Sequence, residues 1–243
     1  MATKPMMQHE RIEPDHKSEH PWAASILLLT ATIVLIAHYY LARPDIIGVF
    51  SDSRDWSRMT LVQLEPRAHF LTSLCLLALA PVLVGRFVLR LRLTDMGLGL
   101  GNWREGMKWL AAGIPLAVFA GWTAGGSPSM QSVYPLDPSV FQAPSHFVGY
   151  ALLAFLYYGS WEVLFRGFLL FGLKREFGLS GANAAQTGLS VTAHFGRSLM
   201  ETASALPAGL VFGYVANRVG SIWYVAVIHW VVGMSTEWFA AMP

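Results

Sequence analysis

Charged residues are scarce in this sequence. Asp, Glu, Lys and Arg together make up 13% of the 243 residues, whereas soluble domains carry about 25%. Hydrophobic residues make up 54%, so the chain has too few charges to cover a water-exposed surface. A soluble enzyme and a disordered chain are therefore excluded. The net charge of +2 is too small to indicate a polyanionic ligand, so no nucleic-acid partner is expected.

Cysteine is also nearly missing. The single cysteine, Cys75, allows neither an internal disulfide nor a cysteine-based metal cluster. A recognisable signal peptide is missing as well, because acids and bases alternate in residues 1–21 and no small-residue cleavage site follows. We expect residues 1–21 to form a polar N-terminal tail, and residues 22–243 to form a single integral membrane domain.

Long apolar stretches are what the sequence does contain. About 20 apolar residues of helix cross a bilayer, and seven stretches approach that length. The sequence therefore predicts an all-α, polytopic transmembrane helix bundle of about seven spans. The predicted spans are 23–41, 70–89, 103–124, 147–173, 180–196, 205–216 and 221–240, of which the sixth is short.

The distribution of Lys and Arg predicts the orientation in the membrane. With the N-terminus inside, the inner segments carry most of the basic residues, as the positive-inside rule requires. The basic residues of the loop at 43–68 oppose this orientation, but the balance favours it. An odd number of spans then places the C-terminus outside.

Ionisable residues within the predicted spans are the candidates for chemistry, because each costs about 2.5–3.5 kcal/mol to insert. Glu162 and Arg166 lie four residues apart and share a helix face, where they form either a packing ion pair or a tuned carboxylate. His194 and His229 lie in later spans. Glu201 follows His194 by seven residues, so it either shares that side of a continuing helix or is a loop carboxylate paired with Arg197.

Three segments resemble the motifs of a known family. The run YYGSWEVLFRG at 157–167 is similar to its first motif, TAH at 192–194 to the end of its second, and the stretch at 208–229, which ends in IH, to its closing segment. The family is the CAAX-protease and bacteriocin-processing family of glutamic-type intramembrane endopeptidases. The resemblance covers about 145–240 and implies a peptidase in the bacterial cytoplasmic membrane that cleaves a membrane-associated peptide or protein tail.

The resemblance also implies site residues. In the family, the first of two adjacent glutamates and the histidine of the second motif activate water, and the last motif supports the oxyanion with His and Asn. This chain has Trp161 at the first glutamate, Ser190 where the second motif has Phe, and Gly233 where Asn or Asp is usual. Of the matching positions it keeps the set Glu162, Arg166, His194 and His229.

These residues predict a mechanism with an alternative. Glu162 would be the general base, held by Arg166, while His194 shares the water and protonates the leaving amine. His229 would donate to the oxyanion, and Glu201 is a substitute carboxylate. The alternative, motivated by Trp161 and Gly233, is a catalytically inactive protease fold acting as a scaffold, assembly factor or immunity protein.

No cofactor is expected. Two histidines and a carboxylate also match a zinc ligand set, but the sequence has no H-E-x-x-H motif and the ligands would come from separate helices. The predicted spans place Glu162 and His194 about 9 Å apart in depth, at 1.5 Å per residue. Glu201 matches His194 better, which favours a site that opens outward.

Overall fold

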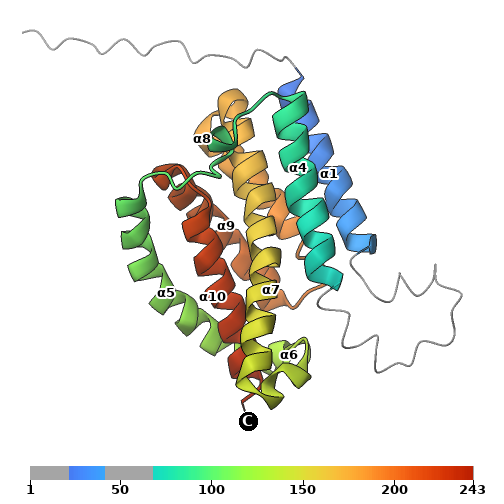
Figure 1. The fold of residues 1–243 in the computed structure, drawn as a ribbon, viewed down its shortest axis with the longest axis vertical. Coiled ribbons are helices and arrows are strands. Elements are labelled where there is room, and N and C mark those ends of the chain that lie inside the picture. The colour runs from blue at the N-terminus through green and yellow to red at the C-terminus, as the bar shows by residue number, and fades with distance from the viewer. Residues whose placement is uncertain (1–21, 42–67, 243) are drawn as a thin grey trace, which may run out of the picture.

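The computed structural model describes residues 22–41 and 68–242, and every long element among them is helical. Seven long helical segments run roughly along one axis (Figure 1). The predicted tail 1–21 and most of the loop at 43–68 lie outside the described residues. The principal elements are α1 (Ala23–Leu41), a helix over 68–88 that includes α4 (Ala80–Leu83), α5 (Trp103–Gly125), α7 (Pro144–Glu162), η5 (Val163–Leu170), α8 (Phe171–Thr192), α9 (Leu199–Val219) and α10 (Trp223–Ala240). Short connecting elements are η3 (Leu93–Met96), α6 (Pro128–Gln131) and η4 (Pro138–Gln142).

Four of these helical segments are long and apolar enough to cross a membrane. They are Ala23–Leu41, Ala68–Val88, Pro144–Thr192 and Leu199–Val219. The all-α prediction is confirmed, whereas the number of spans stays a prediction. The fifth and sixth predicted spans differ most from the observed helices. The fifth helix ends at Thr192 rather than 196, and the sixth runs over Leu199–Val219 and is not short.

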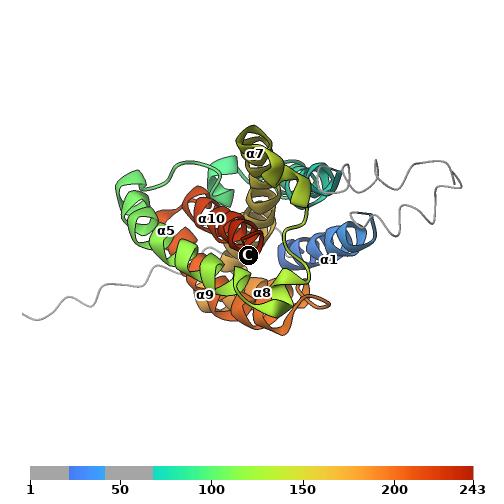
Figure 2. The ribbon, with the colours of Figure 1, turned by 90° about the horizontal axis from the view of Figure 1, so that it is seen from below.

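The segment that contains Glu162 is the most deeply buried part of the bundle. All eight residues of η5, a π-helical continuation of α7, are buried. Phe165, Phe168 and Leu169 are fully enclosed and pack with α1, the 68–88 helix and α10 in one hydrophobic cluster. Viewed along the bundle, α10 lies inside a ring of the other long helices (Figure 2). This enclosure keeps Glu162 and Arg166 away from lipid.

A kink at Gly178 folds the chain back on itself. Gly178 has φ 65° and ψ 173°, a conformation open to glycine but strained for residues with a Cβ. The chain rises through α7 and η5, and the part of α8 after the kink returns along η5. Glu162 lies sixteen residues before Gly178 and His194 sixteen residues after it. The Trp161 ring, next to Glu162 in the chain, packs against His194 with ring centroids 5.1 Å apart, so the two arms bring Glu162 and His194 to similar depths.

Glycines allow α5 and α10 to pack closely. A Cβ built on Gly106, Gly113 or Gly121 would overlap a side chain of α10, and one built on Gly125 would lie 2.8 Å from the Ala240 backbone nitrogen. Small residues let membrane helices approach and gain van der Waals contact. This packing supports α10, which carries His229.

Replacing Gly121 by alanine is expected to destabilise the bundle by about 1–3 kcal/mol, because the new Cβ would lie 2.8 Å from the backbone nitrogen of Thr236 and must push the helices apart. Gly149→Ala is the matched control, since Gly149 is an exposed helical glycine with no atom near its added Cβ. That control should be neutral or gain up to about 1 kcal/mol. Thermal unfolding in detergent measures both. Equal midpoints for the two variants would refute the close packing.

Candidate active site

Glu162 stands at the centre of a buried polar cluster. Its Oε1 accepts one hydrogen bond from Arg166 Nη1 at 3.1 Å and another from His229 Nδ1 at 2.7 Å. The Glu162 side chain is 0% exposed and that of Arg166 is 3% exposed. Because α7 passes directly into the π-helical η5, the two residues stay on one continuous helical segment. The predicted ion pair is therefore present, and His229 from α10 joins it.

His229 separates Glu162 from the interior cavity. Glu162 does not line that cavity, whereas His229 and Arg166 do. A carboxylate oxygen only accepts hydrogen bonds, so His229 Nδ1 donates the proton of its hydrogen bond with Glu162 Oε1. The Nε2 atom of neutral His229 then carries a lone pair. Glu162 thus fixes the tautomer of His229 rather than reaching the cavity itself.

His194 lies in a turn that follows α8, not within a helix. Its Nδ1 is 2.7 Å from the backbone oxygen of Ser190. A carbonyl oxygen only accepts hydrogen bonds, so Nδ1 carries the proton and Nε2 of the neutral ring is a free acceptor. The Thr202 hydroxyl donates to the His194 carbonyl at 3.0 Å, and the Trp161 ring packs against the imidazole with centroids 5.1 Å apart. The ring is therefore held in place.

Glu201 lies in the first turn of α9, where Ser198 caps the helix by accepting a hydrogen bond from the Glu201 backbone N–H at 3.2 Å. Its Oε1 is 3.9 Å from Arg197 Nε, so the predicted pairing with Arg197 is present. Its Oε2 is buried, and apart from the nearby Tyr134 hydroxyl no donor among the described residues approaches this carboxylate oxygen. The helix of His194 does not continue to Glu201. Instead, the intervening turn brings both residues to one place.

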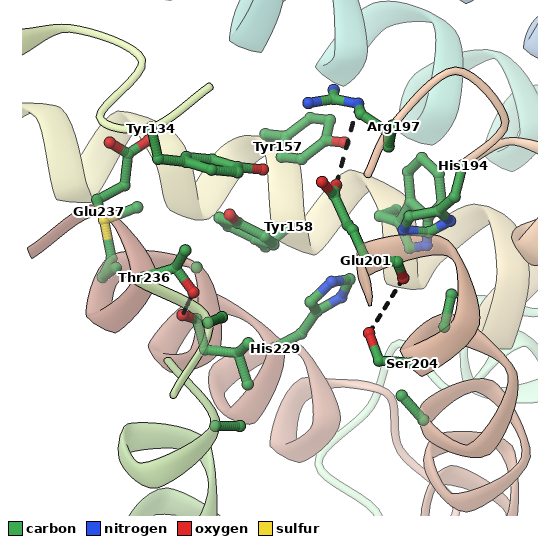
Figure 3. A pocket seen from close by; sticks show the side chains of 18 of the residues that line it. Tyr134, Tyr157, Tyr158, His194, Arg197, Glu201, Ser204, His229, Thr236 and Glu237 are labelled. Atoms are coloured by element: carbon green, nitrogen blue, oxygen red, sulfur yellow. Dashed lines mark hydrogen bonds and ion pairs between the residues drawn. The ribbon is translucent and has the colours of Figure 1, made fainter. Parts of the chain in front are cut away.

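These groups meet at one cavity of about 330 Å³. Arg166, His194, Glu201 and His229 all line it, and the Glu201 side chain extends between Arg197 and the His229 ring (Figure 3). A second cavity of about 640 Å³ lies beside the end of α1. The two cavities share the wall formed by His69, Tyr157, Trp161, His194, Arg197 and Glu201. A ligand in either cavity therefore reaches His194 and Glu201.

Sequence reasoning missed the tyrosines and the second acid of the cavity. Tyr134 and Tyr158 line it, and Tyr134 lies outside the long helices. Burial, with a smaller contribution from the charge of Glu201, raises the pKa of the Tyr134 phenol far above its usual value, so this hydroxyl stays protonated. At the other end, Glu237 accepts hydrogen bonds from the Tyr150 hydroxyl at 2.8 Å and the Leu136 backbone N–H at 2.9 Å. The YY pair before the first motif was the available signal for Tyr158.

The positions that depart from the family pattern are filled in the structure. Trp161 is 5% exposed and packs between Phe165 and His194. A Cβ built on Gly233 would overlap the Tyr158 hydroxyl, so that tyrosine occupies the space of a side chain at 233. Within the described part of the chain, no three His, Cys, Asp or Glu side chains are arranged to hold a metal ion.

Comparison with known families gives one match. Residues 144–235 match the model of the Rce1-like family, described as type II CAAX prenyl endopeptidase Rce1-like. No curated protein and no solved structure matches the chain. The matched segment contains Glu162, Arg166, His194, Glu201 and His229. Together with the four long apolar helices, the match indicates an integral membrane protein whose residues 144–235 match the Rce1-like type II CAAX prenyl endopeptidase family.

Proposed function

We propose that this protein is an intramembrane endopeptidase that hydrolyses a peptide bond in a membrane-associated peptide or protein tail. The observation that carries the proposal is the convergence of Glu201, His194 and His229 on one cavity inside the bundle. A water molecule has two protons, so His229 Nε2 can accept one hydrogen bond from it while Glu201 or His194 removes the other proton, as amide hydrolysis requires. The activity needs no metal or other cofactor.

Glu201 is the general base in this mechanism. Its Oε2 has a free lone pair in the cavity, and His194 Nε2 is the alternative acceptor for the same water proton. As the water oxygen attacks the carbonyl carbon, its proton passes to Glu201 or His194. The carbon–nitrogen bond then breaks, and the same proton goes to the leaving amine. This assignment differs from the sequence-based one, which gave the base to Glu162.

Glu162 and Arg166 act through His229. Arg166 donates a hydrogen bond that holds the Glu162 carboxylate, and Glu162 holds the proton of His229 on Nδ1. His229 then presents Nε2 to the water and orients it for attack. Both residues are positioning groups, because the reacting atoms meet His229 and not Glu162.

The bilayer is the partner that presents the substrate. The second cavity, beside α1, shares a wall with the first and supports an extended substrate that continues past His194. We also propose the bacterial cytoplasmic membrane as the location, with the N-terminus inside, on the distribution of Lys and Arg. The site then opens toward the outer side, where the turn between α8 and α9 lies.

A catalytically inactive scaffold, assembly factor or immunity protein is the second candidate. Trp161 favours it, because a buried indole rather than a carboxylate packs against His194. This candidate predicts that the wild-type protein cleaves no peptide, while it still binds its partner in the membrane.

The test is cleavage of a panel of membrane-anchored peptides by the protein in liposomes, with products identified by mass. Wild-type protein should cleave at least one peptide, and His229→Ala should lower kcat about 10²-fold because the water loses its orientation. His146→Ala, which changes an exposed histidine at the start of α7, is the control and should match wild type. A chelator should leave the rate unchanged.

Three results would contradict the proposal. If no peptide of the panel is cleaved by protein that a thermal unfolding experiment shows to be folded, the inactive candidate is favoured. Cleavage by His229→Ala at the wild-type rate would show that the reaction does not take place in this cavity. Cleavage that a chelator abolishes would contradict the cofactor-free mechanism and support a metal site instead.

A further inference from the structure

The two histidines of the cavity present acceptors, not donors. His229 donates its Nδ1 proton to Glu162, and His194 donates its Nδ1 proton to the Ser190 carbonyl. The charge of Glu162 is already balanced by Arg166, so the hydrogen bond to Glu162 needs only the neutral form of His229. With both rings neutral, both Nε2 atoms carry lone pairs. An oxyanion that develops on the substrate carbonyl needs hydrogen-bond donors already in place, so another residue must supply the donor.

The Tyr158 hydroxyl is such a donor. Tyr158 lies on α7, four residues before Glu162 and on the same helix face. Its ring packs edge-on against the His229 imidazole with centroids 4.9 Å apart, and it lines the cavity beside Tyr134 and Glu201 (Figure 3). No hydrogen bond joins its hydroxyl to any other described residue. The hydroxyl is therefore free to donate to a ligand.

Gly233 gives the Tyr158 hydroxyl its position. Gly233 lies on α10, four residues after His229, and any Cβ at 233 would overlap the phenol oxygen. The hydroxyl thus lies directly against the α10 backbone, one helical turn from His229. A side chain at 233 would displace it.

We infer that Tyr158 is the oxyanion donor of this site, an inference that rests on the proposed peptidase function. When water attacks the carbonyl carbon, the carbonyl electron pair moves to oxygen, and the Tyr158 hydroxyl donates a hydrogen bond to that oxygen while keeping its proton. The carbonyl re-forms as the carbon–nitrogen bond breaks. The water's proton travels separately, through Glu201 or His194 to the amine.

Tyr158→Phe tests this inference on a peptide that the wild-type protein cleaves. Loss of one oxyanion donor lowers kcat about 10²- to 10³-fold, and KM should change little because the bond forms mainly in the transition state. Tyr224→Phe is the matched control. This variant also loses a hydroxyl, which donates a 3.0 Å hydrogen bond to the Leu100 carbonyl. Tyr224 does not line the cavity, so the variant should keep the wild-type kcat.

Two further variants keep the test decisive. Gly233→Ala should lower kcat as Tyr158→Phe does, because the new Cβ displaces the hydroxyl. Should Tyr158→Phe or Gly233→Ala fail to fold, 3-fluorotyrosine at 158 keeps the shape of the ring. Its phenol is more acidic and is therefore a stronger hydrogen-bond donor, so kcat should rise above that of the wild-type protein.

The failures of the two proposals are distinguishable. Wild-type kcat in folded Tyr158→Phe, or in the protein with fluorotyrosine at 158, would overturn the oxyanion assignment and leave the peptidase function standing. An inactive wild-type protein would overturn the peptidase function itself. A loss confined to KM would assign Tyr158 to substrate binding and overturn its role in the transition state.

Discussion

Glu201→Gln is expected to lower kcat for peptide cleavage by about 10²- to 10⁴-fold, the usual contribution of a general base. Glutamine keeps the size of the side chain but cannot take a proton from water. His194→Ala should cause a loss of similar size. Because both groups act on the same water, the double variant should be little worse than either single variant. The measurement is kcat for each of the three variants on one peptide.

Glu105→Gln is the matched control for Glu201→Gln. Both glutamates lie in the first turn of a helix, three residues after a capping side chain, and each lies near a basic residue. The control should keep full activity, because Glu105 lies outside both cavities. A wild-type kcat in Glu201→Gln would show that a group other than Glu201 is the general base. Multiplying losses in the double variant would show that Glu201 and His194 act at separate steps.

Glu162→Ala is expected to destabilise the protein by about 3–5 kcal/mol, because it leaves the buried Arg166 charge without its partner. It should also lower kcat at least about tenfold, since His229 loses the acceptor that fixes its tautomer. Thermal unfolding in detergent and peptide cleavage measure the two effects separately.

The double variant Glu162→Gln with Arg166→Met distinguishes stability from positioning. It removes both charges, and replacement of a buried ion pair by neutral groups of similar size is often tolerated. The glutamine oxygen still accepts the hydrogen bond from His229 Nδ1. We expect the free energy of unfolding of the double variant to lie within about 1 kcal/mol of the wild-type value. We also expect it to recover most of the activity. A double variant as unstable as Glu162→Ala would show that lost packing, not the unpaired charge, causes the instability.

Much of the fold was predictable because membrane helices are marked by composition. The first predicted span, 23–41, coincides with α1, and the third differs from α5 by one residue. Prediction was poorest in the fifth and sixth spans. There, small and polar residues replace the apolar pattern, and the Ser198 cap that begins α9 lies within a weakly patterned segment. Gly178 was also overlooked, although its equal separation from Glu162 and His194 is visible in the sequence.

The motif residues were found from the sequence, but their arrangement was not. Spacing of four residues was sufficient to pair Glu162 with Arg166. It could not show that His229, 67 residues later, lies between Glu162 and the cavity. Tyr158 and Gly233 are 75 residues apart in the chain, and only the packing of α7 against α10 shows that one occupies the space of the other.

The sequence by itself therefore determined an all-helical membrane protein and the group of ionisable residues within it, because burial in lipid leaves a strong mark on composition. Only the tertiary structure decided which carboxylate faces the cavity. Glu162 is enclosed by η5 and α10, whereas the turn after α8 places Glu201, in the first turn of α9, at the cavity. That difference depends on long-range packing between helices, for which a single sequence carries no local signal.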